Sequence, residues 1–376
     1  MQFYFKGIQA TDKKAVCYDS IGGFRGLPGE VRFLSIDNGK FEIDHIRKIN
    51  KQGWFSGRDY SYRKTEKKIK RYIVLGDSYS SGIAAAPTWP DMVQDLLLKN
   101  GNDSVELYNF SLEGSGIVNW YRIFKLEIIP HYDFDGVILA CSSEKNSVPD
   151  LDRKFMMMNS FDDATYMAVM DPLSQPIPKV LSKEIAAPII PIYPDEDLDR
   201  IKQTYVRKSR GSFYYKSQKP DLWFLSILYG VSDGFKKMMV IGEQDRMYNQ
   251  PYENYYKLAS LPYKMQYFDE RYKYGPLLKE IIEGCKAESK DMIIMTIPDY
   301  ENAIDFVNKQ EVISRKECQF LSDFYHIKSF DGFSMLEGKD SAAVDKLFHE
   351  YDRHWTNLGV SLFSEKLVKS GVLRAN

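Results

Sequence analysis

A serine follows an apolar run in residues 72–82, Tyr-Ile-Val-Leu-Gly-Asp-Ser-Tyr-Ser-Ser-Gly. The run is short, apolar and partly β-branched, which indicates a buried strand. Gly76 permits a tight turn after that strand, so Ser78 falls where a strand is followed by a helix. Open α/β folds place their chemistry at this carboxyl edge of the sheet. Ser78 is therefore a candidate nucleophile, and its alternative role is that of a helix-capping serine.

A serine hydroxyl is a weak nucleophile, which needs a nearby base and a third group that orients the base. The five histidines of the chain are His45, His131, His326, His349 and His354. His354 has Asp352 two residues earlier, in the loop-like stretch 351–359. His349 has Asp345 four residues earlier, a spacing typical of an exposed helix face. We therefore expect Ser78, His354 and Asp352 to form a nucleophile, base and acid.

The two ends of the chain show an alternation of strand-like and helix-like segments. The expected strands are residues 72–75, 105–110, 137–141, 292–297 and 327–330, and the expected helices are residues 90–98, 119–128, 277–288, 315–324 and 358–369. Strands that alternate with helices indicate a parallel sheet covered on both faces. The class is therefore α/β.

Four short motifs resemble those of the SGNH, or GDSL, hydrolase superfamily. Gly76-Asp77-Ser78 is similar to the first block, and 109–114, Asn-Phe-Ser-Leu-Glu-Gly, is similar to the second. The third block is usually Gly-x-Asn-Asp after a strand. Here 142–147 reads Ser-Ser-Glu-Lys-Asn-Ser, which departs from that pattern and leaves Asn146 as the candidate.

The last block is usually Asp-x-x-His, whereas this chain has Asp-x-His-Trp at 352–355. That variant resembles a subgroup found among polysaccharide O-acetyltransferases and related envelope esterases. Residues 49–58, Ile-Asn-Lys-Gln-Gly-Trp-Phe-Ser-Gly-Arg, resemble the lead-in of bacterial lysophospholipase-like members. The resemblance covers roughly 45–146 and 288–373.

The resemblance implies a three-layer α/β/α sandwich with a flavodoxin-like parallel sheet of about five strands, the SGNH hydrolase fold. It implies a serine esterase that works through an acyl-enzyme, without a metal or cofactor. The oxyanion hole would consist of the backbone N–H groups of Ser78 and Gly114 and the side-chain amide of Asn146. The first alternative is an O-acetyltransferase acting on a surface glycan, and the second is a non-catalytic glycan-binding relative.

The expected organisation is an amino-terminal arm, 1–70, that packs on a hydrolase domain, 71–376. The domain core is 71–146 and 288–373, and 147–287 is a large, mostly helical or irregular insertion. Six prolines between Pro172 and Pro194 and a tyrosine-rich stretch from Tyr248 to Tyr274 mark the insertion. It is interpreted either as a lid or glycan-binding wall or as a helical segment packing on the core.

Composition limits the partners. A net charge of −1 gives no attraction to nucleic acid. The expected partner is a small-molecule or glycan ester substrate, as the resemblance implies. Four scattered cysteines indicate neither a zinc site nor a disulfide framework. No run approaches the ~18 apolar residues of a membrane span, and the first residues lack a signal-peptide core. An upstream anchor would place the protein in the envelope, and its localisation and oligomeric state stay open.

Overall fold

The computed structural model describes residues 8–37, 40–66, 68–143, 148–151, 155–158, 164–167, 195–200, 272 and 274–373. In this part of the chain, no helix is both long enough and apolar enough to cross a lipid bilayer.

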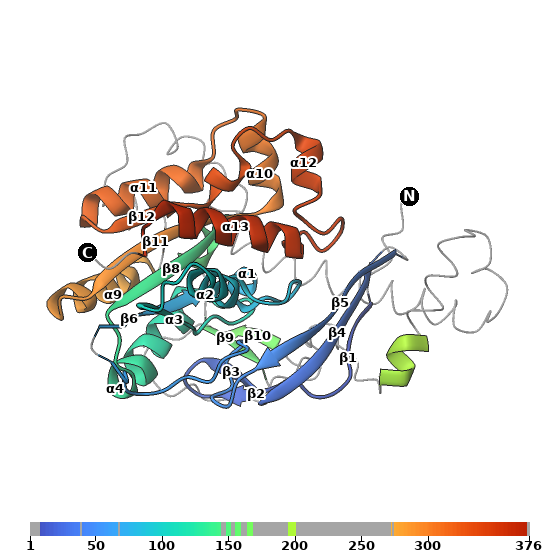
Figure 1. Ribbon diagram of the computed structural model, residues 1–376, viewed down its shortest axis with the longest axis horizontal. Helices are drawn as coiled ribbons and strands as arrows, with labels where there is room; N and C mark the ends of the chain where they lie inside the picture. Colours follow the sequence, from blue (N-terminus) through green and yellow to red (C-terminus); the bar gives the residue numbers. More distant parts are fainter. Residues whose placement is uncertain are drawn as a thin grey trace.

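The centre of the described structure is a five-stranded parallel sheet (Figure 1). Its strands are β6 (Lys70–Gly76), β7 (Val105–Asn109), β8 (Gly136–Ser143), β11 (Asp291–Pro298) and β12 (Lys328–Asp331). Their order is β12-β11-β8-β6-β7, so the first strand of the sheet along the chain lies between the second and the third. This is the flavodoxin-like order. The fold class expected from the sequence is confirmed, and Ser78 follows the strand at the switch point.

Side chains of these strands alternate between two hydrophobic clusters on opposite faces of the sheet. Ile73 and Leu75 of β6 belong to one cluster, whereas Tyr72 and Val74 belong to the other. All eight residues of β8 are buried, as is typical of a parallel strand covered on both faces. The sheet is therefore the middle layer of three.

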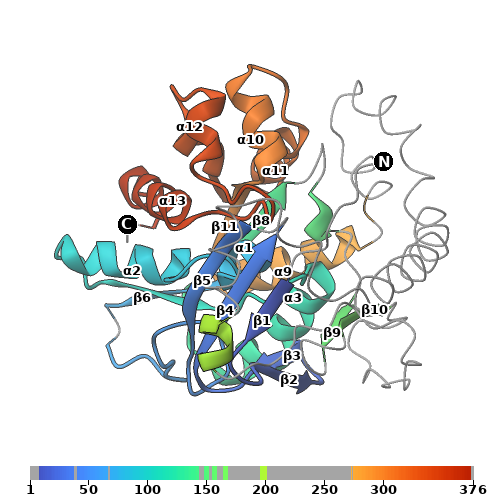
Figure 2. The same cartoon turned by 90° about the vertical axis from the view of Figure 1, so that its right-hand side faces the viewer.

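Helices form the two outer layers. On the face of Tyr72 and Val74 lie α2 (Trp89–Lys99), α10 (Tyr300–Val307), the 3₁₀ turn η5 (Gly332–Leu336), α12 (Ser341–Asp345) and α13 (Asn357–Ser370). On the other face lie α3 (Ile117–Ile123), its π-helical continuation η1 (Phe124–Ile128), α9 (Gly275–Ala287) and α11 (Ile313–Tyr325), with the short α4 (Ile129–His131) following η1. Figure 2 shows α2 beside α13 on one side of the sheet and α3 beside α9 on the other.

The amino-terminal segment forms antiparallel strands that the sequence reasoning did not assign. β1 (Ile8–Thr11), β4 (Gly29–Asp37) and β5 (Lys40–Ile49) make one sheet, and β2 (Val16–Asp19) and β3 (Gly23–Gly26) make a hairpin. Phe24 and Phe33 of these strands belong to the same buried cluster as Ile281 of α9. The amino-terminal strands thus share a core with one face of the parallel sheet.

Most of the expected insertion, 147–287, lies outside the described residues. Its described parts include the turn η2 (Pro149–Leu151), a hairpin of β9 (Phe155–Met158) with β10 (Ala164–Met167), and a helical stretch at 195–200. The strand β9 lies beside β2 and β3. The helix α9, at the end of this region, packs against α3 and β11. The roles proposed for the insertion as a lid or wall stay predictions.

Candidate active site

Ser78 is the first residue of α1 (Ser78–Ser81), a single turn of helix that follows β6. Gly76 makes this turn sterically accessible, because a Cβ there would lie 2.5 Å from Oγ of Ser80 and 3.1 Å from Oγ of Ser111. The Asp77 carboxylate caps the turn by accepting the Tyr79 N–H at 3.0 Å. The local sequence therefore folds the chain back on itself and leaves Ser78 partly exposed at the carboxyl edge of the sheet.

His354 and Asp352 lie next to Ser78. The Ser78 Oγ and His354 Nε2 atoms are 2.7 Å apart, and His354 Nδ1 is 2.7 Å from Oδ1 of Asp352. Arg353 between them has a φ of 67°, in the left-handed region that L-residues rarely adopt. This backbone turn lets a carboxylate only two residues earlier reach the imidazole. The structure thus brings the side chains of Ser78, His354 and Asp352 together.

Two aromatic side chains, Tyr79 and Trp355, lie around the loop that carries the imidazole. The Tyr79 ring centroid lies 4.7 Å from that of His354, and its hydroxyl donates to the Arg353 carbonyl at 3.2 Å. Trp355 is 2% exposed, and its indole N–H donates to the Pro298 carbonyl at 3.1 Å. Trp355 therefore anchors the loop that carries His354 in the core, and Tyr79 lies against the imidazole ring.

Electrostatics favour proton uptake by the imidazole. Desolvation lowers the pKa of His354, but the charge and hydrogen bonds of Asp352 outweigh it, so the pKa lies above the ordinary value of histidine. Asp77 contributes in the same direction. Burial raises the pKa of Asp352, yet its interactions with His354 are stronger and hold that pKa below the ordinary value. Asp352 therefore stays ionised and stabilises an imidazolium.

The second block connects the Ser78 turn to its surroundings. The buried side-chain amide of Asn109 donates to the Ser80 carbonyl at 2.8 Å and to the Phe55 carbonyl at 3.1 Å. Gly114, at the end of the block, has a φ of 65°, a conformation that favours glycine. The loop before it returns to β6, since the Leu112 N–H donates to the Gly76 carbonyl at 3.2 Å.

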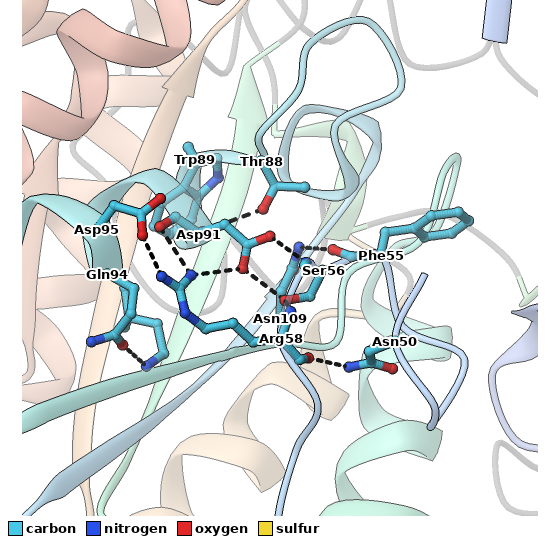
Figure 3. A network of polar contacts seen from close by, with 12 residues as sticks. Asn50, Phe55, Ser56, Arg58, Thr88, Trp89, Asp91, Gln94, Asp95 and Asn109 are labelled. Atoms are coloured by element: carbon cyan, nitrogen blue, oxygen red, sulfur yellow. Dashed lines mark hydrogen bonds and ion pairs between the residues drawn. The ribbon is translucent and has the colours of Figure 1, made fainter. Parts of the chain in front are cut away.

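The lead-in segment 49–58 is held against α2 by an ion-pair network. The Asp91 carboxylate accepts the Ser56 hydroxyl at 2.7 Å, and the Arg58 guanidinium donates to the same carboxylate at 3.4 Å. Arg58 also pairs with Asp95, one turn further along α2. Figure 3 shows the Arg58 guanidinium between these two carboxylates. The network supports the Phe55 carbonyl, which Asn109 contacts, and therefore the Ser78 turn.

Asn146, the expected third oxyanion donor, lies outside the described residues, so its placement is untested. The segments on either side of 144–147 are described. The Asp150 carboxylate accepts the N–H and the hydroxyl of Ser142, at 2.7 and 3.0 Å. The Val148 N–H donates to the Tyr272 hydroxyl at 3.1 Å. No motif in the sequence pointed to Asp150 or Tyr272.

One histidine lies elsewhere than its spacing suggested. The helix α12 ends at Asp345, and the following loop carries His349, so His349 is not on an exposed helix face. Its Nε2 is 3.1 Å from the Ala84 carbonyl, and its backbone N–H donates to the His354 carbonyl at 2.9 Å. The prediction from the i, i+4 spacing of Asp345 and His349 was wrong because α12 is only five residues long and ends at Asp345. Among the described residues, no His, Cys, Asp or Glu side chains gather in threes to hold a metal ion.

Comparison with known proteins gives distant structural similarity only. No protein-family model and no curated protein matches the chain. Solved structures to which the chain is similar include a lipase from a goat rumen metagenome, with 14% sequence identity and a TM-score of 0.36. That match covers 81% of this chain and 99% of the lipase. A catalytic mutant of an acetylxylan esterase from Geobacillus stearothermophilus has 11% identity, coverage of 82% and 100%, and a TM-score of 0.38. A G-D-S-L family lipolytic protein from Veillonella parvula has 10% identity, coverage of 80% and 97%, and a TM-score of 0.35.

Proposed function

We propose that this protein is a serine esterase of the SGNH type, which cleaves a carboxylic ester through an acyl-enzyme. The observation that carries the proposal is the continuous chain of contacts from Ser78 Oγ to His354 Nε2 and from His354 Nδ1 to Asp352, each 2.7 Å long. These residues come from opposite ends of the sequence and meet at the switch point of a flavodoxin-like sheet. That edge is where such folds place their chemistry.

In the proposed acylation, Ser78 Oγ attacks the ester carbonyl while His354 Nε2 takes its proton. Asp352 accepts a hydrogen bond from His354 Nδ1, which selects the tautomer with a free Nε2 lone pair and stabilises the imidazolium. The protonated His354 then donates to the leaving alcohol oxygen as the carbon–oxygen bond breaks. In deacylation, His354 removes a proton from water as the water oxygen attacks the acyl carbon. The bond between that carbon and Ser78 Oγ then breaks, His354 returns the proton to Ser78 Oγ, and the acid is released.

The tetrahedral intermediate needs donors for its negative oxygen. We assign this role to the backbone N–H groups of Ser78 and Gly114 and to the side-chain amide of Asn146. The positive φ of Gly114 and the bonds that tie its loop to Gly76 support the first two. The assignment of Asn146 rests on its position after β8 in the third block.

An O-acetyltransferase acting on a surface glycan is the second candidate function. It is favoured by the Asp352-x-His354-Trp355 sequence, which resembles that of polysaccharide O-acetyltransferases. Both reactions share one acyl-enzyme and differ in whether water or a sugar hydroxyl accepts the acyl group. A non-catalytic glycan-binding role is less well supported, because a binding module has no need of the aligned Ser78, His354 and Asp352.

The test is hydrolysis of p-nitrophenyl acetate, with and without oligosaccharide acceptors. We expect nitrophenol release by the wild-type protein and a loss on the order of 10⁴-fold or more in Ser78→Ala. Ser104→Ala, on the loop before β7, is the matched control and should keep full activity. Free acetate that falls when acceptor is added would indicate transfer. Equal nitrophenol release by Ser78→Ala and wild type would overturn the proposal.

A further inference from the structure

The strand β5 of the amino-terminal sheet contacts the turn that carries the acid and the base. The Glu42 carboxylate accepts the Tyr351 N–H at 2.6 Å and the Asp352 N–H at 3.0 Å, one on each oxygen. These two residues directly precede Arg353, whose left-handed backbone brings Asp352 back to His354. Glu42 therefore binds the turn directly before the residue with the left-handed backbone conformation.

A β-bulge places Glu42 in this position. In the β4–β5 pairing, Ser35 is opposite Ile43 and Ile36 is opposite Phe41, so Glu42 is the extra residue. A bulged residue leaves the strict in-and-out alternation of a strand and can point its side chain in a new direction. Ile43 beside it is 3% exposed and packs in the core cluster. The bulge thus allows the neighbouring Glu42 to reach the turn.

Farther along β5, Arg47 contacts the nucleophile half of the site. Its Nη2 donates to the Ser81 carbonyl at 3.3 Å and pairs with the Glu113 carboxylate. Ser81 ends the helix that Ser78 begins, and Glu113 directly precedes Gly114. The Arg47 and Glu113 side chains are 4% and 7% exposed, and the guanidinium lies 4.0 Å from the Phe55 ring centroid. This buried ion pair joins the Ser78 turn to the Gly114 loop.

The placement of Glu42 carries an electrostatic cost. Burial raises the pKa of Glu42, and the nearby Asp352 charge adds to that effect, while the two N–H donors and His349 oppose it. The negative charge of Asp352 disfavours a second carboxylate beside it. If the Tyr351 and Asp352 N–H groups needed only hydrogen-bond acceptors, water could supply them. The placement of the Glu42 carboxylate is explained if the turn at Tyr351–Asp352 must be held in one geometry.

We propose that β5 is a positioning strand for the active site, in which Glu42 orients the Asp352–His354 turn and Arg47 orients the Ser78 turn and the Gly114 loop. Neither side chain is a catalytic residue, since each acts through the residues that it holds. This inference rests on the proposed function, which it extends to residues outside the four hydrolase motifs. It implies that the amino-terminal sheet is part of the esterase.

The test compares Glu42→Ala, Glu42→Gln and Ile43→Ala. Ile43→Ala is the matched control, because it destabilises the same strand without touching the turn. Glu42→Ala should lower kcat about 10–100-fold with little change in KM, since a misplaced base weakens only the transition state. Glu42→Gln keeps one acceptor oxygen and should recover part of the loss. Ile43→Ala should lower Tm and leave kcat unchanged at temperatures well below that Tm.

A second readout does not depend on turnover. Proton NMR should show a downfield signal from the His354 Nδ1–H bound to Asp352, assigned by its loss in Asp352→Asn. We expect the signal to persist in Ile43→Ala and to broaden or disappear in Glu42→Ala. An unchanged signal together with unchanged kcat in Glu42→Ala would overturn the positioning role. Full turnover by Ser78→Ala would refute the proposed function, and the NMR signal would still test the role of Glu42.

Discussion

At the scale of single residues, the site depends on the backbone of Arg353. The common spacing in this kind of motif leaves two residues between acid and base, whereas here only one intervenes. With a φ of 67° at Arg353, the Asp352 carboxylate still reaches His354 Nδ1 at 2.7 Å. The shorter loop therefore needs stronger support, which Glu42, Tyr79 and the Phe348–Trp355 bridge supply.

Replacement of Asp352 by Asn should lower kcat about 10⁴-fold, because an amide favours the wrong imidazole tautomer. On the acid side of the pH profile, kcat/KM rises as His354 becomes neutral. The pKa of His354 lies above the ordinary value of about 6.5. Loss of the Asp352 charge lowers that pKa, so the midpoint of this rise should move to lower pH. Asp345→Asn is the control, because its carboxylate bonds Tyr300 and not His354. A midpoint that stays in place would contradict the pairing.

Asn146 is a prediction at the same scale. If its amide donates to the oxyanion, Asn146→Ala should lower kcat ~10²–10³-fold. Asn102→Ala, in the loop after α2, serves as a control and should leave the rate unchanged. Near-normal turnover by Asn146→Ala would mean that another group near 142–143 supplies the third donor.

At the scale of elements, the position of Ser78 follows from the close approach of α1 to the end of β6. Gly76→Ala should destabilise the protein by about 1–3 kcal/mol, because the new methyl group meets Ser80 and Ser111. It should also lower kcat by displacing the Ser78 turn. Gly284→Ala in α9 is the matched control, since its nearest neighbour, Phe124, would be 3.6 Å away. Urea unfolding and kcat measure both effects, and a stable, active Gly76→Ala would show that the turn tolerates a side chain.

The parallel sheet was accessible to sequence reasoning because its central strands β6, β8 and β11 contain short, buried apolar runs. The expected strand 105–110 corresponds to β7, and the expected helix 358–369 corresponds to α13. The amino-terminal strands were missed because their pattern is interrupted. In β5 the buried positions include Arg47, and a bulge at Glu42 breaks the alternation. Polar residues that a tertiary contact buries carry no periodic signal.

The same reasoning explains which site residues were predicted. Ser78, Asp352 and His354 stand in short sequence motifs. The residue types of these motifs, taken together, point to few other functions. Glu42 and Arg47 are ordinary charged residues, and their partners lie 309 and 66 positions away in the sequence. Their role follows from the fold alone.

At the scale of the whole molecule, the amino-terminal sheet and the parallel sheet behave as parts of one core. Arg71 at the start of β6 is 1% exposed and donates to the Ser61 carbonyl at 3.0 Å and the Asp133 carbonyl at 3.1 Å. This buried guanidinium ties the end of the amino-terminal segment to the central sheet. The expected arm, 1–70, is therefore predicted to unfold together with the active site.

Phe33→Ala tests this prediction. Phe33 is fully buried in β4, so the change should cost about 3–5 kcal/mol of unfolding free energy. Near-UV circular dichroism and esterase activity should be lost at the same lowered temperature. Phe324→Ala, at a side chain that is half exposed, should have little effect. Inactivation at the wild-type temperature in Phe33→Ala would mean that the amino-terminal sheet unfolds separately from the site.

The central claim is that Ser78 is a nucleophile activated by His354 and Asp352. Its most direct test is reaction with a fluorophosphonate, followed by intact-mass measurement and peptide mapping. The account predicts one adduct per chain, on Ser78, and slow or absent labelling in His354→Ala, in which Ser78 remains without its base. Labelling on another residue, or equal labelling rates in wild type and His354→Ala, would contradict it.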